Sequence, residues 1–108
     1  MGTILKAICP CGFEKEDIYY GGGMMNFTTH CGVPALNHKT WRFLTENYFN
    51  KDKLPEEVVF YDDPQMYSGK LEQYRGIHWG DVYLNPKHNF CPLCKKFNME
   101  FQNVGCFD

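Results

Sequence analysis

The sequence predicts one mainly β domain, with an α+β fold as the alternative. Two observations lead to this prediction. Residues 3–20 are rich in Ile, Phe and Tyr and are broken by a Cys-Pro-Cys-Gly turn, which is typical of two strands joined by a tight turn. Near the C-terminus, Phe97, Met99 and Phe101 alternate with polar residues, and a period of two is typical of a half-buried strand.

The composition supports a folded domain and excludes several classes of protein. Of 108 residues, 44% are hydrophobic and 17% aromatic, which permits a packed core and argues against disorder. The net charge of −2 excludes a strongly basic nucleic-acid module. No apolar run approaches the roughly 20 residues of a membrane span, so we expect no membrane partner. The first residues are too short and polar a stretch for a signal peptide, which predicts a cytoplasmic protein.

The middle of the chain contains the best helix candidate. Three glycines at 21–23 end the first hairpin, and residues 24–36 fit a loop or a short strand. Residues 37–50 place Trp41, Leu44 and Tyr48 at i, i+3 and i+7, which predicts one face of a helix. Asn37 or Thr40 would cap that helix. The composition of residues 40–45 also fits a strand, so this alternative stays open.

Residues 51–84 predict short strands between polar links. The run Val58-Val59-Phe60-Tyr61 is expected to be a strand that ends at Asp62-Asp63-Pro64. Residues 65–80 contain scattered glycines and read as irregular, and residues 81–84 fit a further short strand. Neither pair of neighbouring carboxylates in this stretch has a catalytic spacing, so the sequence favours a protein that is not an enzyme.

Six cysteines give the strongest chemical signal. In a secreted chain this even count would suggest disulfides, but in a reducing compartment metal binding or catalysis is favoured. A C-x-x-C turn lets two sulfurs face one ion, and a closed structural site needs four ligands. The turn at 9–12 supplies the second pair, and Gly12 suits the positive φ that such turns require. The predicted metal ligands are Cys9, Cys11, Cys91 and Cys94. The thiols or imidazoles that remain open as further ligands are Cys31, Cys106, His30 and His88.

Two cysteine turns on two hairpins resemble a zinc ribbon with rubredoxin-like knuckles. The chain is also similar to small uncharacterised bacterial zinc-ribbon proteins that open with a C-x-C-G turn and a glycine-rich stretch. The resemblance covers residues 1–23 and 84–108 and implies that 24–83 are an insertion within the single domain 1–108. The N-terminal turn departs from the usual pattern, because one residue instead of two separates its cysteines. The long separation is tolerable because loop-closure entropy grows only logarithmically.

Four thiolates suit Zn²⁺ or a single Fe ion. With zinc, the resemblance implies a structural metal in a non-catalytic protein that acts through protein or nucleic-acid interaction. With iron, or with a reactive dithiol, the same cysteines would make a rubredoxin-like electron carrier or a thiol redox protein. The dithiol reading is the weaker of these two, because a strand rather than a helix is expected after Cys94. His30 and Cys31 are adjacent and so point apart, which argues against a catalytic pair.

The expected partner is a protein, with nucleic acid as the alternative. Basic and aromatic side chains surround the second cysteine turn, and single-stranded nucleic acids bind such combinations. These residues are Lys87, His88, Lys95 and Lys96, interleaved with Phe90 and Phe97. Residues 51–63 instead carry five acidic and two basic groups, and this acidic balance favours a protein partner. The sequence identifies no small-molecule substrate, and most of its tyrosines and tryptophans are expected to fill the core.

Overall fold

The fold is mainly β, which confirms the predicted class. A computed structural model of the chain describes residues 2–22, 29–67, 77–79 and 82–107. The longest helical segment among these residues is a 3₁₀ helix of six residues. The described elements are β1 (Gly2–Ile8), β2 (Glu14–Tyr20), β3 (Gly32–Asn37), β4 (Arg42–Asn47), η1 (Tyr48–Lys53), β5 (Val58–Phe60), η2 (Pro64–Met66), β6 (Ile77–Trp79), β7 (Val82–Leu84) and β8 (Glu100–Phe107).

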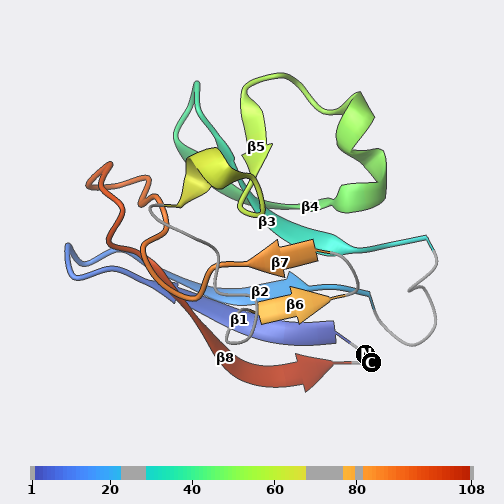
Figure 1. Cartoon of the computed structure of the whole chain (residues 1–108), viewed down its shortest axis with the longest axis horizontal. Helices are drawn as coiled ribbons and strands as arrows, with labels where there is room; N and C mark the ends of the chain where they lie inside the picture. Colours follow the sequence, from blue (N-terminus) through green and yellow to red (C-terminus); the bar gives the residue numbers. More distant parts are fainter. Residues whose placement is uncertain (1, 23–28, 68–76, 80–81, 108) are drawn as a thin grey trace.

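The described strands form three small antiparallel sheets (Figure 1). The first has the order β2-β1-β8, the second has the order β4-β3-β5, and β6 pairs with β7. The glycines at the ends of β2 and β3 connect the first two sheets, because Gly21 and Gly32 exchange backbone hydrogen bonds of 2.7 and 2.9 Å. Gly21 has φ +91°, and a Cβ there would lie 2.4 Å from the Trp79 indole, so only glycine fits.

Both halves of the expected N-terminal hairpin are present. β1 and β2 pair from Thr3↔Tyr20 to Ile8↔Glu14, with a register shift between Leu5 and Ala7. The predicted strands at 58–61 and 81–84 correspond to β5 and β7. Residues 65–80 contain two elements that were not expected, η2 and β6, while 68–76 and 80 lie outside the described residues. Residues 24–36 are expected to form a loop or a short strand: 24–28 lie outside the described residues, and the end of the stretch forms the strand β3.

The helix predicted over residues 37–50 is wrong, and the strand left open for residues 40–45 is confirmed from residue 42 onward. Instead, β4 pairs with β3 along its whole length, from Gly32↔Asn47 to Asn37↔Arg42. Asn37 does accept hydrogen bonds through Oδ1, from the Lys39 and Thr40 amides at 2.8 and 3.0 Å, but it closes a hairpin loop rather than starting a helix. Trp41 ends that loop with φ +61°. Strand pairing outweighed the helical spacing, because β-branched and aromatic residues favour a strand once a partner is available.

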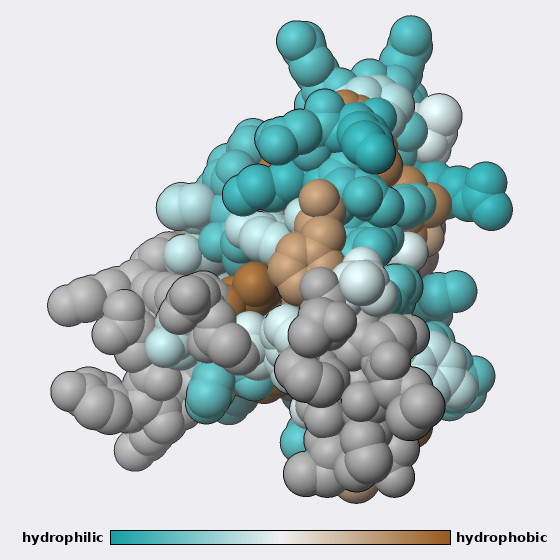
Figure 2. All heavy atoms as spheres, turned by 90° about the vertical axis from the view of Figure 1, so that its right-hand side faces the viewer, coloured by the Kyte–Doolittle hydropathy of each residue, from teal (hydrophilic) through white to brown (hydrophobic). Residues whose placement is uncertain are grey.

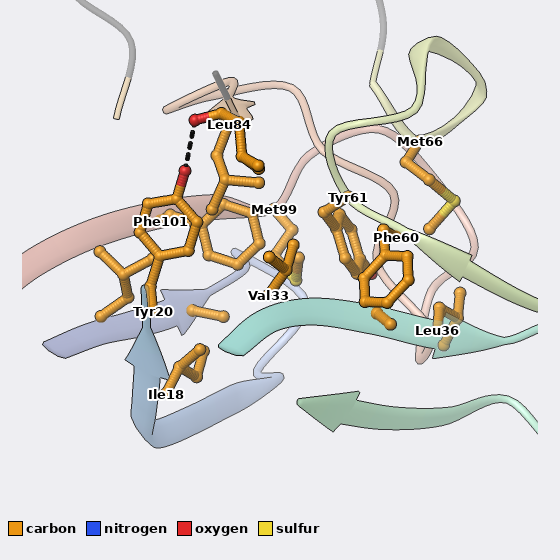
Figure 3. Close-up of a cluster of buried hydrophobic side chains, with 14 of the residues drawn as sticks. Ile18, Tyr20, Val33, Leu36, Phe60, Tyr61, Met66, Leu84, Met99 and Phe101 are labelled. Atoms are coloured by element: carbon orange, nitrogen blue, oxygen red, sulfur yellow. Dashed lines mark hydrogen bonds between the residues drawn. The ribbon is translucent and has the colours of Figure 1, made fainter. Parts of the chain in front are cut away.

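One core joins all three sheets (Figure 3). Tyr20 and Ile18 from β2 pack with Val33 and Leu36 from β3, and Leu84 and Met99 complete the cluster from the C-terminal part. Large side chains that are fully buried contribute about 1.5–3 kcal/mol each to stability. The polar ends of the buried tyrosines are satisfied, since Tyr20 donates to the Val82 carbonyl at 2.7 Å.

The sheet order brings the two cysteine turns to one end of the molecule (Figure 1). β1 and β8 are antiparallel neighbours, and the last residue of β1, Ile8, pairs with the first residue of β8, Glu100. The first cysteine turn directly follows β1, and the second precedes β8. A simple ribbon implies that each cysteine turn lies on a hairpin of its own. The C-terminal turn does not. A single bridge, Asn89↔Met99, closes it, and its outgoing strand joins the N-terminal hairpin.

Figure 2 shows the face of the molecule that lies opposite the two cysteine turns. Its described residues are mainly hydrophilic, with a few apolar atoms between them. None of the helices among the described residues has both the length and the apolar character needed to cross a membrane.

Candidate metal centre

The N-terminal knuckle, residues 9–12, is a tight turn held by the ends of β1 and β2. The Cys9 amide donates to the Phe13 carbonyl at 3.0 Å, and the Gly12 amide donates to the Cys9 carbonyl at 3.0 Å. Gly12 has φ +107°, a conformation that disfavours residues with a Cβ. The positive φ that the sequence predicts for Gly12 is therefore confirmed.

The C-terminal knuckle, residues 91–96, is built from the chain between two bridge residues. The Cys91 amide donates to the Lys96 carbonyl at 2.9 Å, and the Lys95 amide donates to the Cys91 carbonyl at 2.8 Å. Lys95 takes a positive φ of 59° without being glycine. The residue that leads into the knuckle, Phe90, is anchored on both sides: its amide donates to Met66, and its carbonyl accepts from the Tyr61 hydroxyl at 2.7 Å.

The four predicted sulfurs lie together. Cys9 Sγ is 3.7 Å from Cys94 Sγ, and Cys11 Sγ is 3.6 Å from Cys91 Sγ. All four Sγ atoms lie within 4.8 Å of one another. A tetrahedral zinc with Zn–S bonds of about 2.3 Å needs sulfurs about 3.8 Å apart, so the two short distances match that geometry. They are far longer than the ~2.05 Å of a disulfide, and all six cysteines are free thiols.

Exposure and pKa differ among the four thiols. Cys91 is fully buried, Cys9 is 7% exposed, and Cys94 is half-buried, whereas Cys11 is exposed. Burial raises the pKa of Cys9 to about 12 and also raises the pKa of Cys91. A hydrogen bond from the Phe13 backbone lowers the pKa of Cys11 to about 7. Such N–H donors favour the thiolate, which is the form that binds a metal.

Backbone donors also face two of the more buried sulfurs. The Cys11 amide opposes the burial effect at Cys9, and the amides of Leu93 and Cys94 do so at Cys91. Both turns therefore aim main-chain N–H groups at their sulfurs. This arrangement stabilises negative charge in a cluster that four thiolates would otherwise make repulsive, and a cation between the sulfurs would complete it.

The other candidate ligands do not belong to this group. Among the described residues, the cluster contains only the four knuckle cysteines. Cys31 is buried in the core next to β3, and His30 beside it is exposed. Cys106 lies exposed on β8. His88 is three residues before Cys91 but is exposed, and it takes φ +62° in the loop.

Aromatic side chains pack beside the C-terminal knuckle. The Trp41 ring stacks on Phe90 at 5.8 Å between centroids, and Phe97 meets Phe90 edge-on at 5.6 Å. The Lys95 ammonium lies 4.6 Å from the Trp41 ring centroid, a cation–π contact. Sequence reasoning missed the place of Trp41 beside the site, because it assigned this residue to a helix. Nothing in the local pattern reveals that the β3–β4 loop reaches the knuckle.

The acidic pair at 62–63 forms a turn, as the sequence predicts. Asp63 accepts from the Gln65 amide at 3.1 Å and caps η2. Asp62 is more enclosed than expected: the Tyr48 hydroxyl donates to it at 2.7 Å, and burial raises its pKa.

Comparison with known proteins gives no relative. No protein-family profile, no curated protein and no solved structure matches this chain.

Proposed function

We propose that Cys9, Cys11, Cys91 and Cys94 bind one Zn²⁺ as a structural tetrathiolate site. The observation that supports this most is the pair of contacts between the knuckles, at 3.6 and 3.7 Å, which match the edges of a zinc tetrahedron. The ion would join the beginning of the chain to its last strand. It would thereby close a loop whose middle residues build the rest of the core.

The site favours a structural role over a catalytic one. Four protein ligands leave no open position on a tetrahedral zinc for water or substrate. In both turns, backbone N–H groups donate to the sulfurs themselves, which favours the thiolate that binds a metal. We therefore propose a zinc-ribbon-like protein without enzymatic activity. A tetrathiolate site is maintained in a reducing compartment, which is consistent with the cytoplasm.

Metal content tests this proposal. The protein is purified without added metal, and the metal per chain is measured by elemental mass spectrometry. We expect about one zinc per chain and about four thiols that become reactive only after chelation, while Cys106 reacts from the start. One iron per chain and a red colour would replace structural zinc with rubredoxin-like electron transfer. A metal-free protein that takes up neither ion would overturn the proposal.

We further propose that the protein acts by binding a partner protein at the knuckle end. Three of its exposed large hydrophobic side chains lie there: Trp41, Leu93 and Phe97, with Leu93 63% exposed. Lys95 and Lys96 flank the same turn, but a zinc tetrathiolate carries a formal charge of −2 that offsets them. An apolar contact with a protein is therefore favoured over binding to a polyanion.

A titration with a labelled single-stranded oligonucleotide separates the two kinds of partner. At about 150 mM salt we expect no saturable binding below roughly 100 μM, the range of weak electrostatic association. Tight binding that weakens steeply with salt, and that is lost in a Lys95→Glu/Lys96→Glu variant, would instead assign the surface to nucleic acid.

A further inference from the structure

The four sulfurs of the metal centre are unequally protected. Cys11 is exposed, as are its neighbours Pro10 and Gly12, and a Cβ placed on Gly12 would meet no atom within 4 Å. Cys91 is fully buried, and the sulfur of this thiol lies 3.6 Å from that of Cys11. A reagent from solvent therefore meets Cys11 first, and Cys91 stands behind it.

We propose that the centre is a peroxide-sensitive switch in which Cys11 and Cys91 form a disulfide and the zinc ion is released. This inference depends on the proposed function, because it assumes that the four thiolates hold zinc. Its basis is geometric: Cys11 is the exposed cysteine of the four, Cys91 is fully buried, and their sulfurs lie 3.6 Å apart across the knuckles.

The chemistry balances with a hydroperoxide as the oxidant. The Cys11 thiolate attacks one peroxide oxygen, the O–O bond breaks, and a sulfenic acid and hydroxide form. The Cys91 thiolate then attacks the Cys11 sulfur and displaces a second hydroxide, which forms the S–S bond. Two sulfurs each lose one electron, and the peroxide gains two. The zinc ion, left with two thiolate ligands, dissociates.

The pairing across the knuckles has a structural consequence. A Cys11–Cys91 disulfide links the end of β1 to the turn that precedes β8, so it replaces the metal as the connection between the two parts. Cys9 and Cys94, 3.7 Å apart, are placed to form a second such link. A disulfide between Cys91 and Cys94 would leave the two knuckles without a covalent link between them. The oxidised protein is therefore expected to stay folded without zinc and to recover the ion after reduction.

Zinc release and disulfide mapping test the switch. The zinc-loaded full chain, in a Cys106→Ser background that removes the other exposed thiol, is treated with hydrogen peroxide. A coloured chelator follows the release of zinc, and mass spectrometry of unreduced peptides identifies the disulfides. We expect about one zinc released per chain, the Cys11–Cys91 disulfide formed first, and rebinding after reduction with a dithiol.

Two matched variants each remove one ligand. Cys11→Ser should slow the oxidation at least tenfold. Cys94→Ser, which loses a less exposed sulfur but keeps the reacting pair, should still form the Cys11–Cys91 disulfide at least as fast as the parent protein. Equal rates in the two variants, or a first disulfide between Cys91 and Cys94, would overturn the switch.

The outcomes for the switch and for the zinc site are distinguishable. If the protein binds one zinc that peroxide does not release, the switch is wrong and the structural site stands. If the protein binds no zinc, the proposed function is wrong, and the same peptides from the metal-free protein report whether the two thiols still pair.

Discussion

The two knuckles place two sulfurs each at one centre, yet they are supported in different ways. The N-terminal knuckle ends a regular hairpin, and its turn is closed by main-chain bonds at Cys9 and Gly12. The C-terminal turn is also closed by two main-chain bonds, but it is flanked by one bridge instead of a strand ladder, and contacts around Phe90 help to hold it. A strand ladder positions a turn through bonds that exist without the metal. Packing of a loop positions a turn less rigidly, so the C-terminal knuckle depends more on the metal ion for its conformation.

Removal of the metal should reveal the largest difference in stability between the two knuckles. Chelation is expected to lower Tm by about 15 °C or more, because structural zinc contributes about 10–16 kcal/mol in small zinc peptides and the β core here supplies part of the stability itself. Hydrogen exchange of the metal-free protein should remain slower at the Cys9 and Gly12 amides than at those of Cys91 and Lys95. Equal loss of protection in both turns would contradict the difference in support.

Replacing one sulfur in each knuckle tests the role of burial. Cys11→Ser and Cys91→Ser each remove one ligand. The serine hydroxyl introduced at position 91 would be fully enclosed, whereas the one introduced at position 11 would face solvent. We expect the Cys91 variant to be less stable by a further 1–2 kcal/mol or so, the cost of enclosing a more polar hydroxyl in place of a thiol. Chemical denaturation with zinc present measures this difference. Cys106→Ser is the control and should have almost no effect.

The backbone of each turn can be tested without touching a ligand. Gly12→Ala should lose about 1–2 kcal/mol because its φ of +107° disfavours a Cβ, even though space is available. Lys95→Gly should change stability by less than about 1 kcal/mol, since relief of its positive φ offsets the greater freedom of the unfolded chain and the lost cation–π contact. Thermal unfolding of the zinc form gives both values. A larger loss for Lys95→Gly than for Gly12→Ala would reverse the comparison.

The smallest expected change in stability is at Asp62, which lies outside both knuckles and serves as a reference for them. Burial raises the pKa of Asp62, so the folded state holds that proton more tightly than the unfolded state does. The contribution of the group to stability is therefore present at low pH and is lost as pH rises through the folded pKa. Asp62→Asn, which keeps an acceptor for the Tyr48 hydroxyl, should be more stable than the parent at pH 7 by less than about 1 kcal/mol.

This advantage should disappear as the pH falls towards about 4, the usual pKa of an aspartate. Acid also weakens metal binding, but it does so in both proteins, so the difference between them isolates Asp62. Zinc affinity at pH 7 should be the same in both, and a change there would mean that the β5–η2 region is coupled to the metal centre.

Some features of the protein follow from local sequence alone. A C-x-C-G turn between two strand-like stretches predicts the N-terminal knuckle, because a positive φ favours glycine whatever surrounds it. The alternation of Phe97, Met99 and Phe101 predicts a half-buried strand. In the structure Met99 and Phe101 are buried, but the strand, β8, begins only at Glu100, and Phe97 lies before it, 38% exposed beside Phe90. The spacing of the four cysteines likewise singles out those that meet.

The tertiary structure decided the rest. Residues 42–47 are a strand because β3 offers them a pairing edge, and the periodicity of a single segment carries no information about its partner. The knuckles meet because β8 pairs with β1, although the paired residues are 92 to 105 positions apart in the sequence. The unequal exposure of Cys11 and Cys91, and the position of Trp41 beside the second knuckle, follow from that packing. Sequence alone thus determined which sulfurs are available. Only the pairing of distant strands determined how they are arranged, because burial and contact arise where separate parts of the chain meet.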